Sequence, residues 1–215
     1  MKIFVPIKEN SQRVPRKNFR VLSRNPLYLR LFEKLKNFDV YVDTDSDEII
    51  KSLSEKYTNV HAYRRKSSLV GDKVSVCDLI QSFIDRFDIE DDWICQVHVT
   101  SPFLRTDTLE NVKELTNSDY DSIVSCNVLQ SRLWRSEDYG FSPVNHNPVY
   151  LQQTQDLPKY YEENSLFYAF KSNTFKKTNM RIGYNPYFYE VGFPENIDID
   201  TEEDWNLVKK IEESS

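Results

Sequence analysis

A positively charged loop at residues 8–18 holds the side chains best suited to phosphate chemistry. Within eleven residues it gathers four cations, a hydroxyl and side-chain amides, supplied by Lys8, Asn10, Ser11, Arg13, Arg16, Lys17 and Asn18. Transfer of a nucleotidyl group develops negative charge on phosphate oxygens, and fixed donors stabilise that charge. The loop has no glycine, so it is neither a Walker A loop nor a dinucleotide fingerprint. We predict a triphosphate-binding loop, with an ordinary solvated surface loop as the alternative.

A pair of carboxylates near the end of the chain suits a hard cation. Asp198 and Asp200 are two residues apart, and side chains at that spacing in an extended segment project to the same side. Mg²⁺ prefers oxygen ligands and commonly keeps water molecules while bridging to substrate phosphates. The pair therefore predicts part of a magnesium site. The alternative is that Asp200 only caps the helix that follows.

Asp43 and Asp45 have the same spacing but a different setting. They are followed by Ser46, Asp47 and Glu48, a sequence typical of a helix N-terminus with acidic residues in its first turn. For this second pair we favour a structural role.

A third polar group follows the segment 93–97 and contains His98, Thr100, Ser101 and Arg105. An imidazole, two hydroxyls and a guanidinium are suited to binding sugar hydroxyls, although a lone histidine is more often structural. The three histidines of the chain are dispersed, and their spacing builds neither a zinc site nor a Ser-His-Asp arrangement.

The elements that would position these groups alternate between strands and helices. Apolar runs predict strands at 2–7, 39–42, 59–63, 93–97, 122–128, 166–170 and 186–191. Helical spacing predicts helices through 49–57, 76–87 and 109–115, the last capped by Thr106 or Asp107, and a terminal helix capped near Thr201. This order predicts an α/β fold, a Rossmann-like three-layer sandwich with a mostly parallel sheet in one domain over 1–215. Ligands are expected beyond the carboxyl ends of its strands.

Residues 130–163 break this rhythm. Prolines and aromatic residues are scattered there among polar residues without a sustained period. We interpret the segment as an excursion from the sheet that forms an active-site flap or a dimer contact, because aromatic residues are enriched in interface cores. An ordinary long loop is the alternative.

Composition excludes several other classes of protein. The net charge is −6, with cations and acids interspersed, which argues against a nucleic-acid surface. The exception is the cluster Lys8, Arg13, Arg16, Lys17, Arg20, Arg24 and Arg30, which points to a small anionic ligand.

No apolar run is long enough for a membrane span or a signal peptide, so we expect a cytoplasmic protein. Three widely spaced cysteines, Cys77, Cys95 and Cys126, are expected to be buried thiols.

Several short motifs occur together in a particular order. The first motif, at residues 3–18, is a strand followed by a basic loop that contains Ser11, Pro15, Lys17 and Asn18. The later motifs, in chain order, are Val42–Ser46, Arg65–Asp72 with Ser75, Thr100–Pro102, Gln155–Pro158, Asn164 and Asp198–Thr201. In this order they resemble the acylneuraminate and 3-deoxy-manno-octulosonate (Kdo) cytidylyltransferases, the CMP-sialic acid and CMP-Kdo synthetase family. The resemblance spans nearly the whole chain.

The resemblance implies transfer of CMP from CTP to an acidic 2-keto sugar such as a nonulosonate or Kdo, with release of pyrophosphate, for surface polysaccharide or glycan biosynthesis. It implies that the nucleotide contacts Lys8, Asn10, Ser11, Arg13, Lys17, Asn18, Arg65 and Ser75. The sugar would contact His98, Thr100, Ser101, Gln155 and Asn164. Asp198 and Asp200 would bind Mg²⁺, with Lys17, Arg13 and Asp200 as the catalytic residues. It also implies homodimers formed through the excursion.

The chain departs from the family pattern at the loop and at the expected sugar site. Lys8 stands in place of arginine, Asn10 of glycine and Gln12 of lysine. Around the sugar, His98 replaces a frequent glutamine, and Gln153 and Thr154 replace basic residues. The reaction class is therefore better indicated than the identity of the sugar.

Two other functions remain open from the residues. The Asp-x-Asp pairs at Asp43 and Asp45 and at Asp198 and Asp200 leave open a metal-dependent glycosyltransferase that consumes a nucleotide sugar. The loop substitutions also allow a non-catalytic relative that binds nucleotide or sugar without turnover.

Overall fold

The computed structural model describes residues 1–11 and 13–214, so the substitution noted at Gln12 lies outside the described residues. A central sheet of seven strands runs in the order β11-β7-β10-β6-β1-β4-β5. Its strands are β1 (Lys2–Ile7), β4 (Asp39–Thr44), β5 (Val60–Arg64), β6 (Trp93–Val97), β7 (Ser122–Leu129), β10 (Tyr160–Lys171) and β11 (Pro186–Glu190). Only β10 is antiparallel to its neighbours within this sheet. The predicted mostly parallel α/β fold is confirmed.

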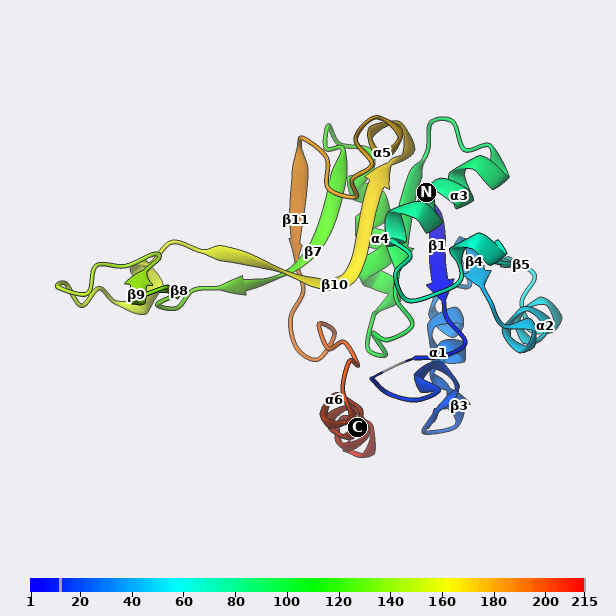
Figure 1. The fold of residues 1–215 in the computed structure, drawn as a ribbon, viewed down its shortest axis with the longest axis horizontal. Coiled ribbons are helices and arrows are strands. Elements are labelled where there is room, and N and C mark those ends of the chain that lie inside the picture. The colour runs from blue at the N-terminus through cyan, green and yellow to red at the C-terminus, as the bar shows by residue number, and fades with distance from the viewer. Residues whose placement is uncertain (12, 215) are drawn as a thin grey trace.

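Helices cover both faces of this sheet and complete the three-layer sandwich (Figure 1). On one face lie α1 (Leu27–Lys34), α2 (Asp47–Lys56) and α4 (Thr106–Leu115); on the other lie α3 (Val76–Phe87) and α5 (Ser172–Thr178). Side chains of β1 enter both cores: Ile3 and Val5 face the first group, and Phe4 stacks on Phe83 of α3 at 4.7 Å between ring centroids. Burial on both faces explains why β1 is an almost continuous apolar run.

The terminal helix α6 (Glu202–Glu213) packs through Trp205 and Val208 in a third, smaller core with Leu22 and Leu27. Leu22 belongs to a short ribbon of β2 (Val21–Leu22) and β3 (Asn25–Pro26) that precedes α1. This packing brings the end of the chain beside the loop that follows β1 (Figure 1).

Residues 130–163 form a protruding arm rather than an unstructured loop (Figure 1). The last residues of β7 pair with the first residues of β10, from Leu129↔Tyr160 to Cys126↔Glu163. Beyond them lies a hairpin of β8 (Trp134–Glu137) and β9 (Gly140–Pro143), followed by the 3-10 turn η3 (Thr154–Asp156). The predicted strand at 166–170 is thus the inner part of a longer strand that starts inside the predicted excursion.

Two further details differ from the sequence predictions. Thr106 is the first residue of α4, not its cap, and its hydroxyl donates a hydrogen bond to the Lys34 carbonyl oxygen at 3.0 Å; Asp107 lies in the first turn, and the N-cap position is Arg105. Cys95 and Cys126 are buried as predicted, whereas Cys77 is only half-buried. Among the described residues, none of the helices combines the length and apolar character needed to cross a membrane.

Candidate functional site

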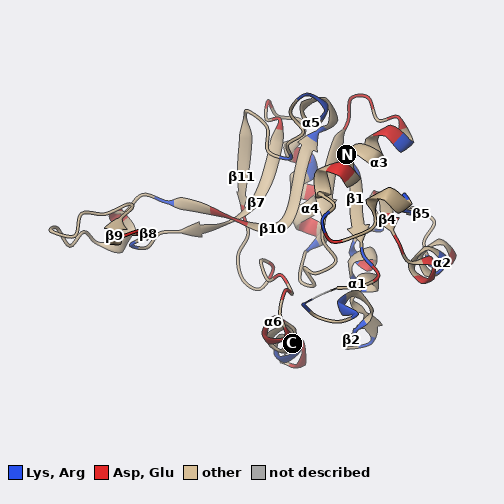
Figure 2. Cartoon of the chain, viewed as in Figure 1, with Lys and Arg blue, Asp and Glu red and all other residues tan. Residues whose placement is uncertain are grey.

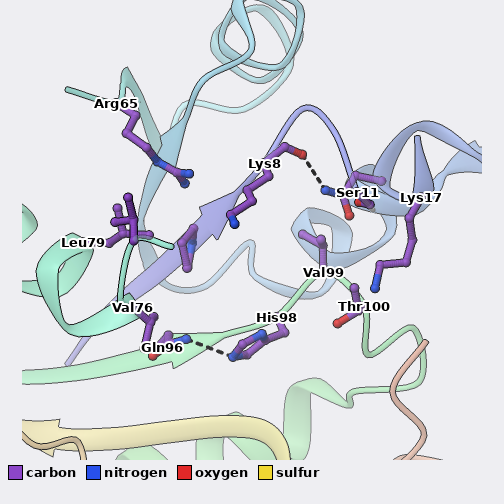
Figure 3. A pocket seen from close by; sticks show the side chains of 13 residues that line it. Lys8, Ser11, Lys17, Arg65, Val76, Leu79, Gln96, His98, Val99 and Thr100 are labelled. Atoms are coloured by element: carbon purple, nitrogen blue, oxygen red, sulfur yellow. Dashed lines mark hydrogen bonds between the residues drawn. The ribbon is translucent and has the colours of Figure 1, made fainter. Parts of the chain in front are cut away.

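A cavity of about 290 Å³ opens beyond the carboxyl ends of β1, β5 and β6 (Figure 3). The three strands are parallel, so their ends meet at one edge and bring together segments that are distant in sequence. Predicted site residues at this cavity are Lys8, Ser11, Lys17, Asn18, Arg65, His98 and Thr100. Val74, Val76 and Leu79 add an apolar wall at the start of α3. The combination of an apolar wall and several cations suits a ligand with an anionic part and a flat, less polar part.

A second cavity, of about 250 Å³, adjoins the first because both are lined by Lys8, Ser11 and Lys17. It adds Asn10 and Arg13 from the same loop. The loop is folded back on itself: the Asn18 side-chain amide donates to the Lys8 carbonyl oxygen at 2.8 Å (Figure 3). It is also tied to the end of β4, because the Glu9 amide donates to Oδ1 of Asp45 at 2.7 Å.

The cations of this loop lie beside carboxylates from the other side of the two cavities. Lys8 Nζ is 3.6 Å from Oδ1 of Asp72, and a guanidinium nitrogen of Arg13 is 2.9 Å from Oδ1 of Asp200. Lys17 Nζ is 3.5 Å from that same Asp200 oxygen and donates a hydrogen bond to the Ile199 carbonyl oxygen. An anionic ligand that enters here would meet preformed donors.

Asp198 and Asp200 have the properties expected of a partial cation site. Oδ1 of Asp198 is buried and has no hydrogen-bond partner among the described residues. Burial raises the pKa of Asp198, the Thr100 hydroxyl opposes this, and the charge of Asp200 adds to it. A cation would relieve both the orphaned oxygen and the repulsion between the two acids. Among the described residues there is no cluster of three or more potential protein ligands, so water and ligand oxygens would complete the coordination.

The alternative role for Asp200, as helix cap, is filled by its neighbour. Thr201 caps α6: its hydroxyl accepts from the Asp204 amide at 3.2 Å, and the Asp204 carboxylate accepts from the Thr201 amide at 2.7 Å. The Asp200 side chain is therefore left to face Arg13 and Lys17.

Arg65 and Asp43 form a buried ion pair at the cavity wall. The guanidinium donates to Oδ1 of Asp43, to the Asp43 carbonyl oxygen at 3.1 Å and to the Ile7 carbonyl oxygen at 3.3 Å. Burial raises the pKa of Asp43, and Arg65 opposes that shift. These contacts fit the structural role favoured for Asp43. Through them Arg65, which follows β5, links the ends of β5, β4 and β1.

His98 lies in the first cavity next to Gln96, and the ring nitrogen Nε2 is 2.9 Å from the Gln96 amide nitrogen (Figure 3). Burial, followed by the charges of Arg181 and Lys17, lowers the pKa of His98 to about 4. The ring is therefore neutral near pH 7 and can take part in hydrogen bonding without carrying charge.

Some predicted site residues lie elsewhere in the single chain. Ser75 is exposed, and its hydroxyl caps α3 by accepting from the Cys77 amide at 3.2 Å. Gln155 lies on the arm and Asn164 at its base, where the Asn164 amide donates to Asn127 at 3.2 Å; neither lines a cavity with His98. Ser101 is buried and does not line the first cavity, whereas its neighbour Thr100 does.

The basic cluster predicted to bind one anion divides into two parts. Lys8, Arg13 and Lys17 lie at the cavities, but Arg20 forms a two-pronged ion pair with Glu202, with nitrogen–oxygen distances of 2.6 and 2.7 Å. Arg30 similarly pairs with Glu212. Positive residues before and within α1 thus face acids of α6, and Figure 2 shows these charges around the lower end of the molecule. This second part joins the segment around α1 to the terminal helix α6.

The sequence predictions missed two residues near the site, Gln96 and Arg181. Gln96 is a fully buried polar side chain in the apolar strand β6, which is unusual enough to suggest a role. Arg181 follows α5, donates a hydrogen bond to Oε1 of Gln96 at 3.2 Å and stacks over the Tyr168 ring at 3.7 Å. Nothing in the local sequence around Arg181 indicates that contact.

Comparisons with known proteins agree with the fold. The family model described as "Cytidylyltransferase" matches residues 3–215. CMP-N,N'-diacetyllegionaminic acid synthase of Legionella pneumophila is 27% identical, with 97% of this chain and 94% of that protein covered. Pseudaminic acid cytidylyltransferase of Campylobacter jejuni is 25% identical, with 95% and 93% covered.

Two solved structures share the fold. The structure of CMP:2-keto-3-deoxy-manno-octonic acid synthetase complexed with CTP has a TM-score of 0.68 and 14% identity, over 99% of this chain and 98% of that one. Crystalline 4-diphosphocytidyl-2C-methyl-D-erythritol synthase has a TM-score of 0.65 and 11% identity, over 98% and 97%.

Proposed function

Because the chain belongs to the cytidylyltransferase family, we propose that it transfers CMP from CTP to an acidic 2-keto sugar and releases pyrophosphate. The observation that carries this proposal is the pair of adjoining cavities, with Lys8, Ser11 and Lys17 shared between them and Asp200 beside Lys17. The two relatives are named for legionaminic and pseudaminic acids, so a nonulosonate is the first choice of sugar and Kdo the second.

The proposed reaction is an in-line displacement at the α-phosphorus of CTP. A hydroxyl oxygen of the sugar forms the new bond to phosphorus and gives up its proton to solvent. The bond from phosphorus to the bridging oxygen breaks, and pyrophosphate leaves with the electron pair. Lys17 and Arg13 lie on one side of the second cavity and would stabilise the negative charge that develops on the phosphate oxygens. The apolar wall of Val74, Val76 and Leu79 would face the base, with Arg65 beside it.

Asp198 and Asp200 would hold Mg²⁺, in keeping with the orphaned Asp198 oxygen and the lack of a competing cap role for Asp200. When bound, the ion would supply charge neutralisation at the phosphates. Arg13 and Lys17 hold Asp200 in place from the other side, which keeps the carboxylate at the boundary of the nucleotide cavity.

We propose a homodimer formed through the arm as part of the same function. Residues 139–155 contain no charged residue, and this uncharged part forms the far end of the arm in Figure 2. Apolar, aromatic surface without charge is typical of interface cores. Gln155 would then act in the sugar site of the partner, which fits its distance from His98 within one chain. A cytoplasmic location, where CTP is available, completes the proposal.

The test is release of pyrophosphate by the purified protein with CTP and Mg²⁺ against a panel of acidic 2-keto sugars, with other nucleoside triphosphates as controls. We expect a signal that requires CTP, one class of sugar and the divalent ion, together with a CMP-sugar product in the mass spectrum. Release of nucleoside diphosphate from a nucleotide sugar would instead support the glycosyltransferase alternative. Binding of CTP without turnover across the panel would support the non-catalytic alternative, and either result would overturn the proposal.

A further inference from the structure

Three side chains form a hydrogen-bonded chain that ends in the first cavity. Arg181 donates to Oε1 of Gln96 at 3.2 Å, and Nε2 of Gln96 lies 2.9 Å from Nε2 of His98. Gln96 is fully buried, and it lines the cavity together with His98, whereas Arg181 does not line it. The order of the chain therefore runs from a cation behind the cavity to an imidazole inside it.

The chemistry of these groups fixes the direction of every hydrogen bond. A guanidinium only donates, so the Gln96 carbonyl oxygen has to face Arg181 and its amide nitrogen has to face His98. The amide nitrogen also only donates, so Nε2 of His98 has to accept. A neutral imidazole that accepts at Nε2 carries its proton on Nδ1.

The charged groups around His98 support a neutral ring. Arg181 and Lys17 lower its pKa together with burial, and Asp200 is the one acid that opposes them. Among the described residues, Arg181 has no carboxylate within ion-pair distance; its guanidinium is held by Gln96 and by the Tyr168 ring, whose hydroxyl donates to Glu163 at 2.8 Å. Nδ1 of His98 has no hydrogen-bond partner among the described residues and remains available to a ligand.

We propose that Arg181 and Gln96 are positioning residues that hold His98 with its proton on Nδ1, so that His98 serves the sugar site as a hydrogen-bond donor only. This inference rests on the proposed function. The ligand atom it recognises is an acceptor oxygen of the acidic sugar, from a hydroxyl or from the carboxylate. His98 in this state cannot act as the general base, because Nε2 is occupied and Nδ1 is already protonated.

The direct test is the tautomer of His98, read from two-bond ¹⁵N–¹H correlation spectra of the labelled protein at neutral pH. The chain has three histidines, so the His98 signals are assigned by their loss in a His98→Asn variant. In the wild type we expect the proton on Nδ1. In Gln96→Glu we expect it on Nε2, because a carboxylate can only accept, and the His98 titration should move up by about one pH unit or more. Arg181→Gln removes the donor that orients Gln96, and we expect a mixture of tautomers.

Kinetics test the link to the sugar. Both variants should raise KM for the sugar by about tenfold while KM for CTP stays within about twofold, because one ligand hydrogen bond is lost. The control is Arg24→Gln, an exposed arginine outside both cavities, which should change neither constant.

Three results would overturn the inference: a wild-type proton on Nε2, an unchanged tautomer in both variants, or equal rises in both KM values. If the protein shows no turnover with any sugar, the proposed function fails, but the spectra still decide the state of His98 separately.

Discussion

The ammonium nitrogen of Lys17 lies 3.5 Å from Oδ1 of Asp200, although the two residues come from opposite ends of the chain. Lys17 lies at the end of the loop that follows β1, and Asp200 precedes α6, which packs beside that loop through Trp205 and Val208. Arg13 reaches the same Asp200 oxygen at 2.9 Å. The contact places the lysine proposed to bind phosphate beside the carboxylate proposed to bind Mg²⁺. The first two predictions test each partner separately.

Asp200→Asn should lower kcat by about 100-fold or more, because the variant keeps the size of the side chain but loses the charge that would hold Mg²⁺. The Mg²⁺ concentration needed for half-maximal rate should rise as well, measured by pyrophosphate release over a magnesium titration. Glu203→Gln, an exposed acid nearby in the first turn of α6, is the matched control and should behave like the wild type. Wild-type rates and magnesium dependence in Asp200→Asn would rule out the metal assignment.

Lys17→Met should also reduce kcat by about 100-fold, since it removes a fixed cation from both cavities while preserving the length of the side chain. Thermal unfolding should show a folded protein, because Arg13 still pairs with Asp200. Lys209→Met, an exposed lysine on α6, serves as the control for loss of one positive charge. A variant with unchanged kcat would mean that Lys17 serves only the packing of the loop.

The ion pair between Arg65 and Asp43 predicts a change in stability. Arg65→Met leaves a buried Asp43 without its partner and should lower the free energy of unfolding by about 3–5 kcal/mol in urea titrations. The neighbouring Arg64→Met breaks a surface pair with Asp47 and should cost less than about 1 kcal/mol.

A double variant separates packing from charge at that pair. Adding Asp43→Asn to Arg65→Met removes the stranded charge and should restore part of the lost stability. If the double variant is less stable by the sum of both single changes, the two residues do not act as a pair.

The convergence of the site was predictable because it follows from topology. Parallel strands end at one edge of a sheet, so recognition of β1 and β6 as strands was enough to bring residues 8–18 toward His98. Asp198 and Asp200 could be assigned from their spacing, and the contact of Asp200 with Lys17 agrees with that assignment without testing it.

The parts that sequence could not predict depend on contacts between distant segments. Arg181 reaches Gln96 across the sheet from the segment after α5, and no periodicity encodes that contact. The motif at Ser75 likewise did not indicate that its hydroxyl caps α3, and the predicted place of Ser75 near the nucleotide remains a prediction. For Gln155, order along the chain carries no information on whether a residue serves its own site or that of a partner copy.

The low pKa of His98 predicts a dependence of stability on pH. Its folded-state pKa is about 4 and the ordinary value is 6.5, so between these values the unfolded chain binds a proton that the folded chain does not. The stability contributed by a neutral His98 is therefore complete above pH 6.5 and is lost as the pH falls toward 4. Relative to His98→Gln, the wild type should lose on the order of 3 kcal/mol over that range. Urea unfolding of both proteins from pH 8 to 4 measures this, and a constant difference would contradict it.

The arm predicts the state of association. Phe141 and Leu151 are 74% and 88% exposed, so a monomer would leave large apolar side chains in water, whereas a second copy could cover them. The wild type should sediment as a dimer, and Phe141→Ser combined with Leu151→Ser should shift it to a monomer in analytical ultracentrifugation.

The same double variant should still bind CTP, because the two cavities proposed to bind the nucleotide lie within one chain. It should lose sugar-dependent turnover, because the contribution proposed for Gln155 of a partner is gone. Val21→Ser with Leu207→Ser, two exposed apolar residues away from the arm, is the control and should remain a dimer. A monomeric wild type, or a dimer that survives the arm substitutions, would show that the arm does not hold two copies together.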